Sequence, residues 1–118
     1  MFVDFYMHRS YPLRKCEYAV IIGTKVSPLG LKYCGNFGFA DCAEKRKYEK
    51  VPCAFNTTDL GIAVGSAVSM AMERRVDNRV MYTIGMAAKE RKLLGNEAEV
   101  IFGIPLSVSS KNPFFDRG

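Results

Sequence analysis

The clearest hydrophobic patterns in the sequence are two short apolar runs. Residues 18–23 (YAVIIG) form a continuous, largely β-branched run that ends in glycine, and residues 99–104 have a similar character. Continuous apolar runs of this length, bounded by turn residues, predict buried strands. Pro105 follows the second run directly. Because proline has no N–H to donate to a ladder, we expect it to end that strand.

The rest of the pattern predicts three helices, a short one over residues 40–50 and two long ones over residues 57–74 and 78–94. Asn56 precedes the first long helix and Asp77 is next to the start of the second, where a side-chain oxygen caps the first-turn N–H groups. The last helix carries an apolar stripe and then a glycine, which commonly ends a helix. The stripe consists of Met81, Ile84, Ala88 and Leu94, and the glycine is Gly95.

The helix over residues 57–74 has an unusual interior, because Gly61, Gly65 and Ser69 fall four residues apart. Each glycine costs about 1 kcal/mol relative to alanine in a helix interior. Such a cost persists where another helix or a flat cofactor must approach the backbone closely. Tight helix packing and a cofactor contact are the two interpretations of this pattern.

These elements together indicate an α+β fold, a small sheet packed with two long helices. Two strands alone make a poor sheet. We therefore expect further strands from an N-terminal arm, residues 1–15, or from a partner subunit, and hence a homodimer or larger homo-oligomer. Phe114 and Phe115 lie in the polar tail, and we expect them to dock on the domain or on a second subunit.

Size and composition fit a single domain over residues 1–118. Hydrophobic residues make up 48% of the 118, which is enough for one core and too many for a disordered chain. The formal net charge is +5. However, the basic residues occur in mixed-charge runs, around residues 44–50 and 89–92, which are typical of solvated helix faces. We therefore do not expect nucleic-acid binding.

The sequence shows no secretory signal and no membrane-spanning segment. The N-terminus lacks a basic start followed by an apolar run. The best apolar stretch, residues 60–72, is too short to span a bilayer. We expect a cytoplasmic protein, in which cysteines serve as thiols or metal ligands before they serve as disulfides.

Three of the four cysteines, Cys34, Cys42 and Cys53, fall within one short stretch that also contains glycines. Closely spaced thiolates, glycines that let the chain wrap and backbone N–H groups near a helix start suit an iron–sulfur cluster. Zinc is an alternative metal, with His8 as a further ligand. The third interpretation is that the thiols are small core residues that bind nothing.

Five strings in the sequence are distinctive. They are residues 52–55 (PCAF), 59–67 (DLGIAVGSA), 76–82 (VDNRVMY), 103–107 (GIPLS) and 111–117 (KNPFFDR). They closely resemble the uncharacterised bacterial and archaeal proteins that contain a ferredoxin domain, and the resemblance extends over residues 30–117. That family has no assigned activity. Its name rests on a four-cysteine pattern, C-x-x-C-x-x-x-x-C with a later Pro-Cys.

The resemblance implies an iron–sulfur cluster held by Cys34, Cys42 and Cys53. The second cysteine of the family pattern falls at Phe37, which cannot ligate iron. The cluster would then be a [3Fe–4S] centre, a [4Fe–4S] centre with an open iron, or a centre completed by Cys16 as the fourth ligand. Complete loss of the cluster is the alternative. The chain also departs from the family in its shorter N-terminal region.

A fainter, fold-level likeness is to flavin-dependent nitroreductases, which are intertwined α+β homodimers with FMN at the subunit interface. Gly61 and Gly65 are the residues that such a flavin would approach. Arg79, near the start of the expected helix over residues 78–94, is a candidate to hold an anion or phosphate. The alternative for Arg79 is an ion pair with the capping residue Asp77.

No Ser/His/Asp, Walker or dinucleotide-binding pattern is present, so the sequence names no reaction. Three functional hypotheses follow. The first is a redox protein that carries electrons on an iron–sulfur cluster. The second is a dimeric binding or assembly module that has lost the cluster, and the third is an FMN-linked reductase.

Overall fold

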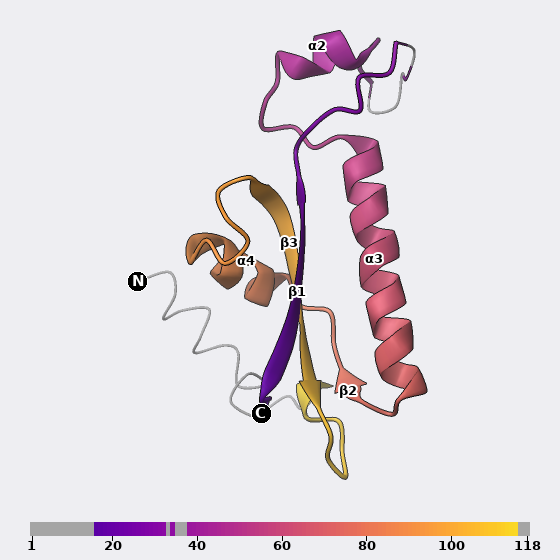
Figure 1. Ribbon diagram of the computed structural model, residues 1–118, viewed down its shortest axis with the longest axis vertical. Helices are drawn as coiled ribbons and strands as arrows, with labels where there is room; N and C mark the ends of the chain where they lie inside the picture. Colours follow the sequence, from indigo (N-terminus) through magenta and orange to yellow (C-terminus); the bar gives the residue numbers. More distant parts are fainter. Residues whose placement is uncertain (1–15, 33, 35–37, 116–118) are drawn as a thin grey trace.

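The computed structural model describes residues 16–32, 34 and 38–115, and within them it confirms the α+β fold. Along the chain the elements are β1 (Tyr18–Lys25), α2 (Cys42–Arg46), α3 (Ala54–Glu73), β2 (Asp77–Asn78), α4 (Tyr82–Glu90), β3 (Ala98–Ser107) and the 3₁₀ helix η2 (Pro113–Phe115). Figure 1 shows α2 beyond one end of the sheet and α3 running alongside it. No helix formed by these residues is long and apolar enough to cross a membrane.

The sheet has three antiparallel strands in the order β1-β3-β2. β3 is central, and Tyr18 of β1 lies opposite Leu106 of β3. The third strand, which we expected from the N-terminal arm or a partner, is supplied by Asp77–Asn78 inside the domain. The arm itself, residues 1–15, lies outside the described residues.

β1 is longer and more exposed than the sequence pattern predicts. It continues past Gly23 to Lys25, and its first three residues are exposed. A continuous apolar run is typical of a strand covered on both faces. β1 is instead an edge strand, with a neighbouring strand on one side alone among the described residues.

Pro105 does not end β3, contrary to our expectation. It lies buried opposite Ala19 of β1, and the strand continues beyond it. Backbone N–H groups alternate between the two sides of a strand. The N–H of Gly103 points away from β1 and donates to the carbonyl of Met81 at 3.1 Å. The nitrogen of Pro105, two residues further along, faces the same side as that of Gly103. It lies opposite the segment between Asn78 and Met81, where the described residues form no strand pairing, so no hydrogen bond is lost.

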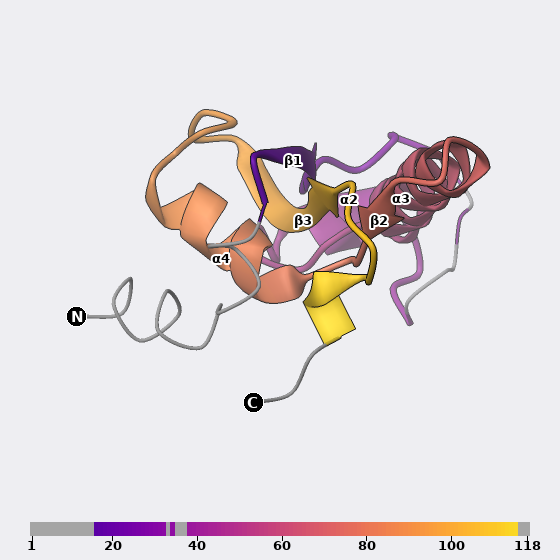
Figure 2. The same ribbon diagram turned by 90° about the horizontal axis from the view of Figure 1, so that it is seen from below.

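Two helices cover opposite faces of the sheet, α3 on one side and α4 on the other (Figure 2). Successive side chains of β3 point to opposite faces of the sheet, so the strand contributes to both cores. The α3 side is built on Leu60, Val64 and Ile104, with Ile22, Ala67, Val68, Val100, Phe102 and Leu106 packed against them. The α4 side is built on Ala88, Ala98 and Ile101, with Ile21 packed against them.

The helix boundaries differ from those expected. α2 is limited to Cys42–Arg46, and α3 begins at Ala54 rather than at residue 57. Cys53, not Asn56, takes the N-cap position of α3. The side-chain oxygen of Asn56 instead accepts a hydrogen bond from the backbone N–H of Ser27 at 3.0 Å. The predicted N-cap was wrong because the Asn56 side chain bonds to a loop 29 residues earlier in the chain.

α4 is shorter than the predicted helix over residues 78–94. Asp77 and Asn78 pair with β3 as β2, so Asp77 caps no helix. The helical segment is Tyr82–Glu90, which leaves α3 as the one long helix among the described residues. Gly95 was expected to stop this helix, but the helix ends at Glu90 with Arg91 as its C-cap. Gly95, at a φ of 78°, lies in the turn that follows.

α4 approaches β3 closely because two facing residues are glycines. A Cβ on Gly85 would lie 1.8 Å from the carbonyl oxygen of Ile101. A Cβ on Gly103 would lie 2.2 Å from Cγ2 of Ile84. Neither position has room for a side chain, so this pair of glycines sets the distance between helix and sheet.

Candidate metal centre

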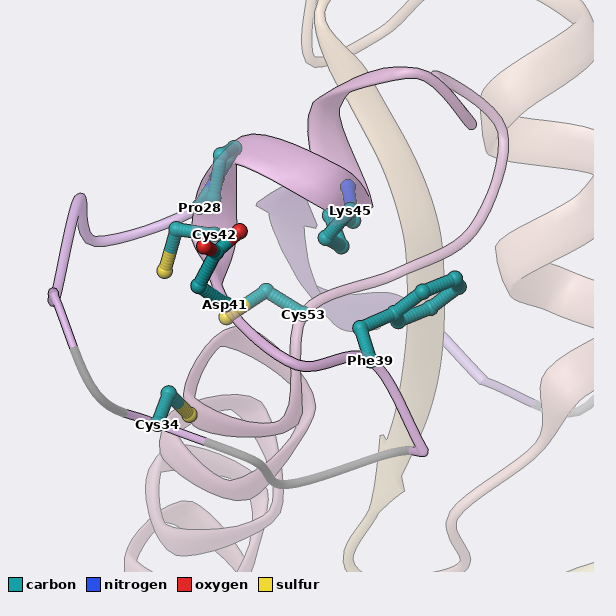
Figure 3. Close-up of a pocket in the computed structure, with 7 residues that line it drawn as sticks. All are labelled: Pro28, Cys34, Phe39, Asp41, Cys42, Lys45 and Cys53. Carbon is teal, nitrogen blue, oxygen red and sulfur yellow. The ribbon is translucent and has the colours of Figure 1, made fainter.

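Three cysteine side chains line one cavity at the end of the sheet where β1 finishes. Cys34, Cys42 and Cys53 share its wall with Pro28, Phe39, Asp41 and Lys45. Figure 3 shows the three cysteines on one side of this site and Phe39 and Lys45 on the other. The fold therefore brings the three cysteines of this stretch into the wall of one cavity.

Asp41 places Cys42 at the start of α2. Its side-chain oxygen accepts a hydrogen bond from the backbone N–H of Glu44 at 2.7 Å. The carboxylate of Glu44 in turn accepts from the N–H of Ala40 at 2.7 Å. This reciprocal pairing resembles a capping box. It makes the buried Cys42 the first helical residue.

Cys53 occupies the N-cap position of α3, a helix of 20 residues. Its side chain makes no capping hydrogen bond to the first turn. The first N–H groups of a helix have no acceptor within it, and together they give that end a partial positive charge. The buried thiol of Cys53 thus lies where a negatively charged group is favoured.

The cavity is small, and its aromatic wall is reinforced. Its volume is about 20 Å³, enough for one water-sized occupant. The ring of Phe39 packs against that of Tyr48 with centroids 5.3 Å apart. Within residues 16–32, 34 and 38–115, no three His, Cys, Asp or Glu side chains form a group that could hold a metal ion as they stand.

Cys16 is not brought to the cavity. It precedes β1, whereas α2, which carries Cys42 of the cavity wall, lies beyond the other end of that strand (Figure 1). At about 3.3 Å per residue, β1 alone separates the two by roughly 23 Å. Burial raises the pKa of the Cys16 thiol above its ordinary value, which disfavours the thiolate that a metal needs.

Gly61 and Gly65 do not serve close packing within the described chain. A Cβ at either position would have no neighbour within 4 Å. Both glycines lie on the exposed side of α3, away from its buried residues Leu60 and Val64. Among the described residues, no other helix approaches α3 at these two glycines.

Arg79 has a structural role that the sequence did not reveal. Its Nη1 donates a hydrogen bond to the carbonyl of Phe114 at 2.8 Å, and its guanidinium lies 4.7 Å from the ring centroid of Phe115. Phe114 is fully buried, which confirms that the tail docks on its own domain. Asp77 accepts a hydrogen bond from Ser109 instead of pairing with Arg79. The guanidinium thus holds the tail, and the expected ion pair with Asp77 does not form between these described residues.

Sequence reasoning missed two polar residues of the cavity wall, Asp41 and Lys45. The Asp41-x-x-Glu44 spacing is a helix-start signal that could have been recognised. Lys45 had no such signal, because it lies in a mixed-charge run that resembles a solvated helix face.

The fold and the cavity together define a small α+β protein with a thiol-lined cavity at one end of its sheet. A family model for uncharacterised proteins containing a ferredoxin domain matches residues 49–117, and the chain belongs to this family. The matched stretch includes Cys53 but begins after Cys34 and Cys42.

A curated relative gives a longer match. An uncharacterised protein of Archaeoglobus fulgidus is 38% identical over 112 residues, which cover 89% of this chain and 60% of the relative. The chain therefore spans less than two thirds of that relative's length. No solved structure matches the chain, so the likeness to nitroreductases gains no support.

Proposed function

We propose that the chain carries electrons on an iron–sulfur cluster ligated by Cys34, Cys42 and Cys53. The observation that supports this most strongly is that three thiols from separate segments line one cavity. Membership of a family named for a ferredoxin domain agrees with the assignment. When bound, the cluster would supply the one-electron chemistry, and the protein would supply its ligands, its charge environment and its shielding from water.

The donor set fits a cluster better than it fits a single ion. The cysteines of a cluster bind different irons, so their sulfur atoms stand further apart than the ligands of one ion. This agrees with thiols that share a cavity without converging on one point. The cavity itself is smaller than a cluster. Binding is therefore expected to move the half-buried Cys34 outward from the two buried cysteines.

The local backbone favours a negatively charged centre. Cys53 occupies the N-cap position at the positive end of α3, and Cys42 begins α2. N–H groups at helix starts stabilise thiolates and the sulfides of a cluster by hydrogen bonding and by charge. The role of these two segments is to make a centre with several negative ligands less costly to bury.

The family's second cysteine position is taken by Phe37, which supplies no ligand, so the fourth ligand must come from elsewhere. Cys16 is remote from the cavity. Asp41 is in the cavity wall, and its carboxylate is the one acidic group there. We propose a three-cysteine centre, either [3Fe–4S] or a [4Fe–4S] centre whose fourth iron is left to Asp41 or to solvent.

Reversible reduction tests this function. We expect anaerobically reconstituted protein to absorb at about 400 nm, as thiolate-ligated clusters do. Dithionite should bleach that band and a mild oxidant should restore it, over repeated cycles. A band that fails to bleach, or that is lost after one cycle, would argue against an electron carrier.

We also propose that α3 associates with α3 of a second copy of the chain. Between Asp59 and Glu73, α3 carries no charged residue over more than three turns, and Ile62 and Met72 in this stretch are 64% and 61% exposed. The proposed contact face consists of Thr58, Gly61, Ile62, Gly65, Ser69 and Met72. A solvated helix normally carries charges on its outer face. Because the chain has a net charge of +5, an uncharged face lets two copies meet without opposing like charges.

Replacing both Gly61 and Gly65 with alanine separates association from folding. Neither Cβ meets anything in the single chain, so each change should stabilise the monomer by about 1 kcal/mol through helix propensity. Between two closely crossing helices the same methyl groups would weaken dimerisation, by roughly tenfold or more. Sedimentation equilibrium and urea unfolding measure the two effects.

Ala63→Gly is the control for this experiment, because Ala63 is exposed on the opposite side of α3 from Gly61 and Gly65. It should leave the association constant unchanged. A wild-type chain that stays monomeric at high concentration would refute the proposal. A double variant that dimerises as tightly as the wild type would do so too.

A further inference from the structure

The outer edge of β1 presents backbone groups that have no partner among the described residues. β1 pairs with β3 on one side, and no described strand lies on its other side (Figure 2). Ile21 lies opposite Gly103, which directs its N–H and C=O to Met81, away from β1. Opposite residues of an antiparallel pair either bond to each other or both face outward. The N–H and C=O of Ile21 therefore point away from β3.

The residues two positions before and after Ile21 face outward in the same way, because a strand alternates. They are Ala19 and Gly23. Proteins commonly protect such an edge from other chains with charges, proline or a bulge. Residues 18–24 contain no charge and no proline, and the register shift with β3 comes only after Thr24. The described part of the chain thus leaves this edge open to a further strand.

We propose that β1 pairs antiparallel with β1 of a second copy of the chain, about a twofold axis at Ile21. In this register Ile21 lies opposite its own copy and Ala19 lies opposite Gly23, so every outward N–H meets a carbonyl. Glu17 and Lys25, each four residues from Ile21, lie opposite each other at both ends of the pairing. Facing opposite charges are favourable, and a shifted register loses them. This complementarity of the strand with itself makes a second copy the occupant.

The same register covers apolar side chains that the single chain leaves exposed. Tyr18 is 73% exposed and Val20 is 38% exposed. In the pairing, Val20 faces the half-buried Ile22 of the second copy, and Tyr18 faces its Thr24. Aromatic and β-branched residues in facing positions stabilise a sheet. Ile22 also packs in the core beneath α3, so the joined sheet continues that core across the junction.

This contact does not depend on the proposed iron–sulfur centre. It also uses a different surface from the proposed contact between α3 helices. A twofold axis at Ile21 runs perpendicular to the sheet, so both α3 helices lie on one face of the joined sheet. The pairing of strands therefore does not exclude the contact between helices, and different substitutions test the two.

Ala19→Pro tests the hydrogen bonds of the junction. The N–H of Ala19 faces away from β3, so proline removes no bond within the described sheet but removes two bonds between the copies. We expect dimerisation to weaken by about tenfold or more in sedimentation equilibrium, with the circular dichroism spectrum of the monomer preserved.

Val20→Lys places a charge within the junction and should also weaken dimerisation by about tenfold or more. Val80→Lys is the matched control, because Val80 has a similar exposure of 40% and lies between β2 and α4, on the far side of β3. It adds the same charge and should leave the association constant close to that of wild type.

Exchange of the end charges tests the register. Glu17→Lys sets lysine opposite lysine at both ends of the junction and should weaken dimerisation roughly fivefold. Adding Lys25→Glu to that variant restores opposite charges in exchanged positions, and most of the lost affinity should return. A double variant that dimerises no better than Glu17→Lys would overturn the register.

Hydrogen exchange identifies the occupant of the edge. The amides of Ala19, Ile21 and Gly23 should be protected where the chain is dimeric and should exchange rapidly after dilution to monomer. Protection that does not depend on concentration would show that another segment of the same chain covers the edge, and would overturn the proposal. A wild-type chain that stays monomeric would overturn it too. If Ala19→Pro and Val20→Lys dimerise as tightly as wild type while the Gly61 and Gly65 double variant does not, the pairing of strands alone is refuted.

Discussion

Gly85→Ala is expected to destabilise the protein by more than about 3 kcal/mol, at or beyond the upper end of the usual cost of overpacking. The new methyl carbon would lie 1.8 Å from the carbonyl oxygen of Ile101. That oxygen belongs to the central strand and cannot turn away as a flexible side chain could. α4 would have to lift from β3, which would open the core around Ala88 and Ile101. Urea denaturation followed by circular dichroism measures the loss.

The same substitution at Gly61 is the control, because a Cβ there meets open space. Gly61→Ala should raise the unfolding midpoint of the monomer while Gly85→Ala lowers it. Opposite signs for one chemical change would establish that packing decides the result rather than helix propensity. A Gly85→Ala variant as stable as wild type would show that α4 does not lie against β3 as described.

Cys53→Ser is expected to remove most of the iron from reconstituted protein. Serine keeps the size of the side chain but replaces a strong thiolate ligand with a weak hydroxyl. Changes to groups that merely support a metal's ligands already cost about 10- to 100-fold in affinity, so loss of a ligand should cost at least as much. Iron analysis and the band at about 400 nm measure the effect. Cys34→Ser and Cys42→Ser should act in the same direction.

Cys16→Ser is the matched control, because Cys16 lies at the far end of β1 from the cavity. It should retain the iron content of wild type. Equal losses from Cys16→Ser and Cys53→Ser would mean that the cavity does not define the ligand set. Unchanged iron in all three cavity variants would mean that iron binds elsewhere on the chain.

The sequence predicted the parts of the fold that depend on local pattern. The apolar runs became β1 and β3, and the small-residue stretch became α3, because period and β-branching act within a few residues. The third strand could not be foreseen, since Asp77 and Asn78 form β2 only by pairing with a strand twenty or more residues later. For the same reason the sequence could not show that a strand continues through Pro105. The proline fits there because the neighbouring edge of the assembled sheet has no hydrogen-bonding partner at that position.

The candidate site was predictable for a similar reason and within similar limits. Cys34, Cys42 and Cys53 are close in sequence, so a short loop and a helix start suffice to bring them together. Arg79 could not be assigned, because its role depends on a partner 35 residues away, the carbonyl of Phe114. Charge alone does not distinguish such residues from a solvated surface.

The most direct test of the central claim is the iron and sulfide content of protein purified without oxygen. The account predicts brown protein with several irons and matching sulfide per chain, in amounts that fall together when any of the three cavity cysteines is replaced. Colourless protein that contains no iron after anaerobic purification, and none after reconstitution, would contradict it.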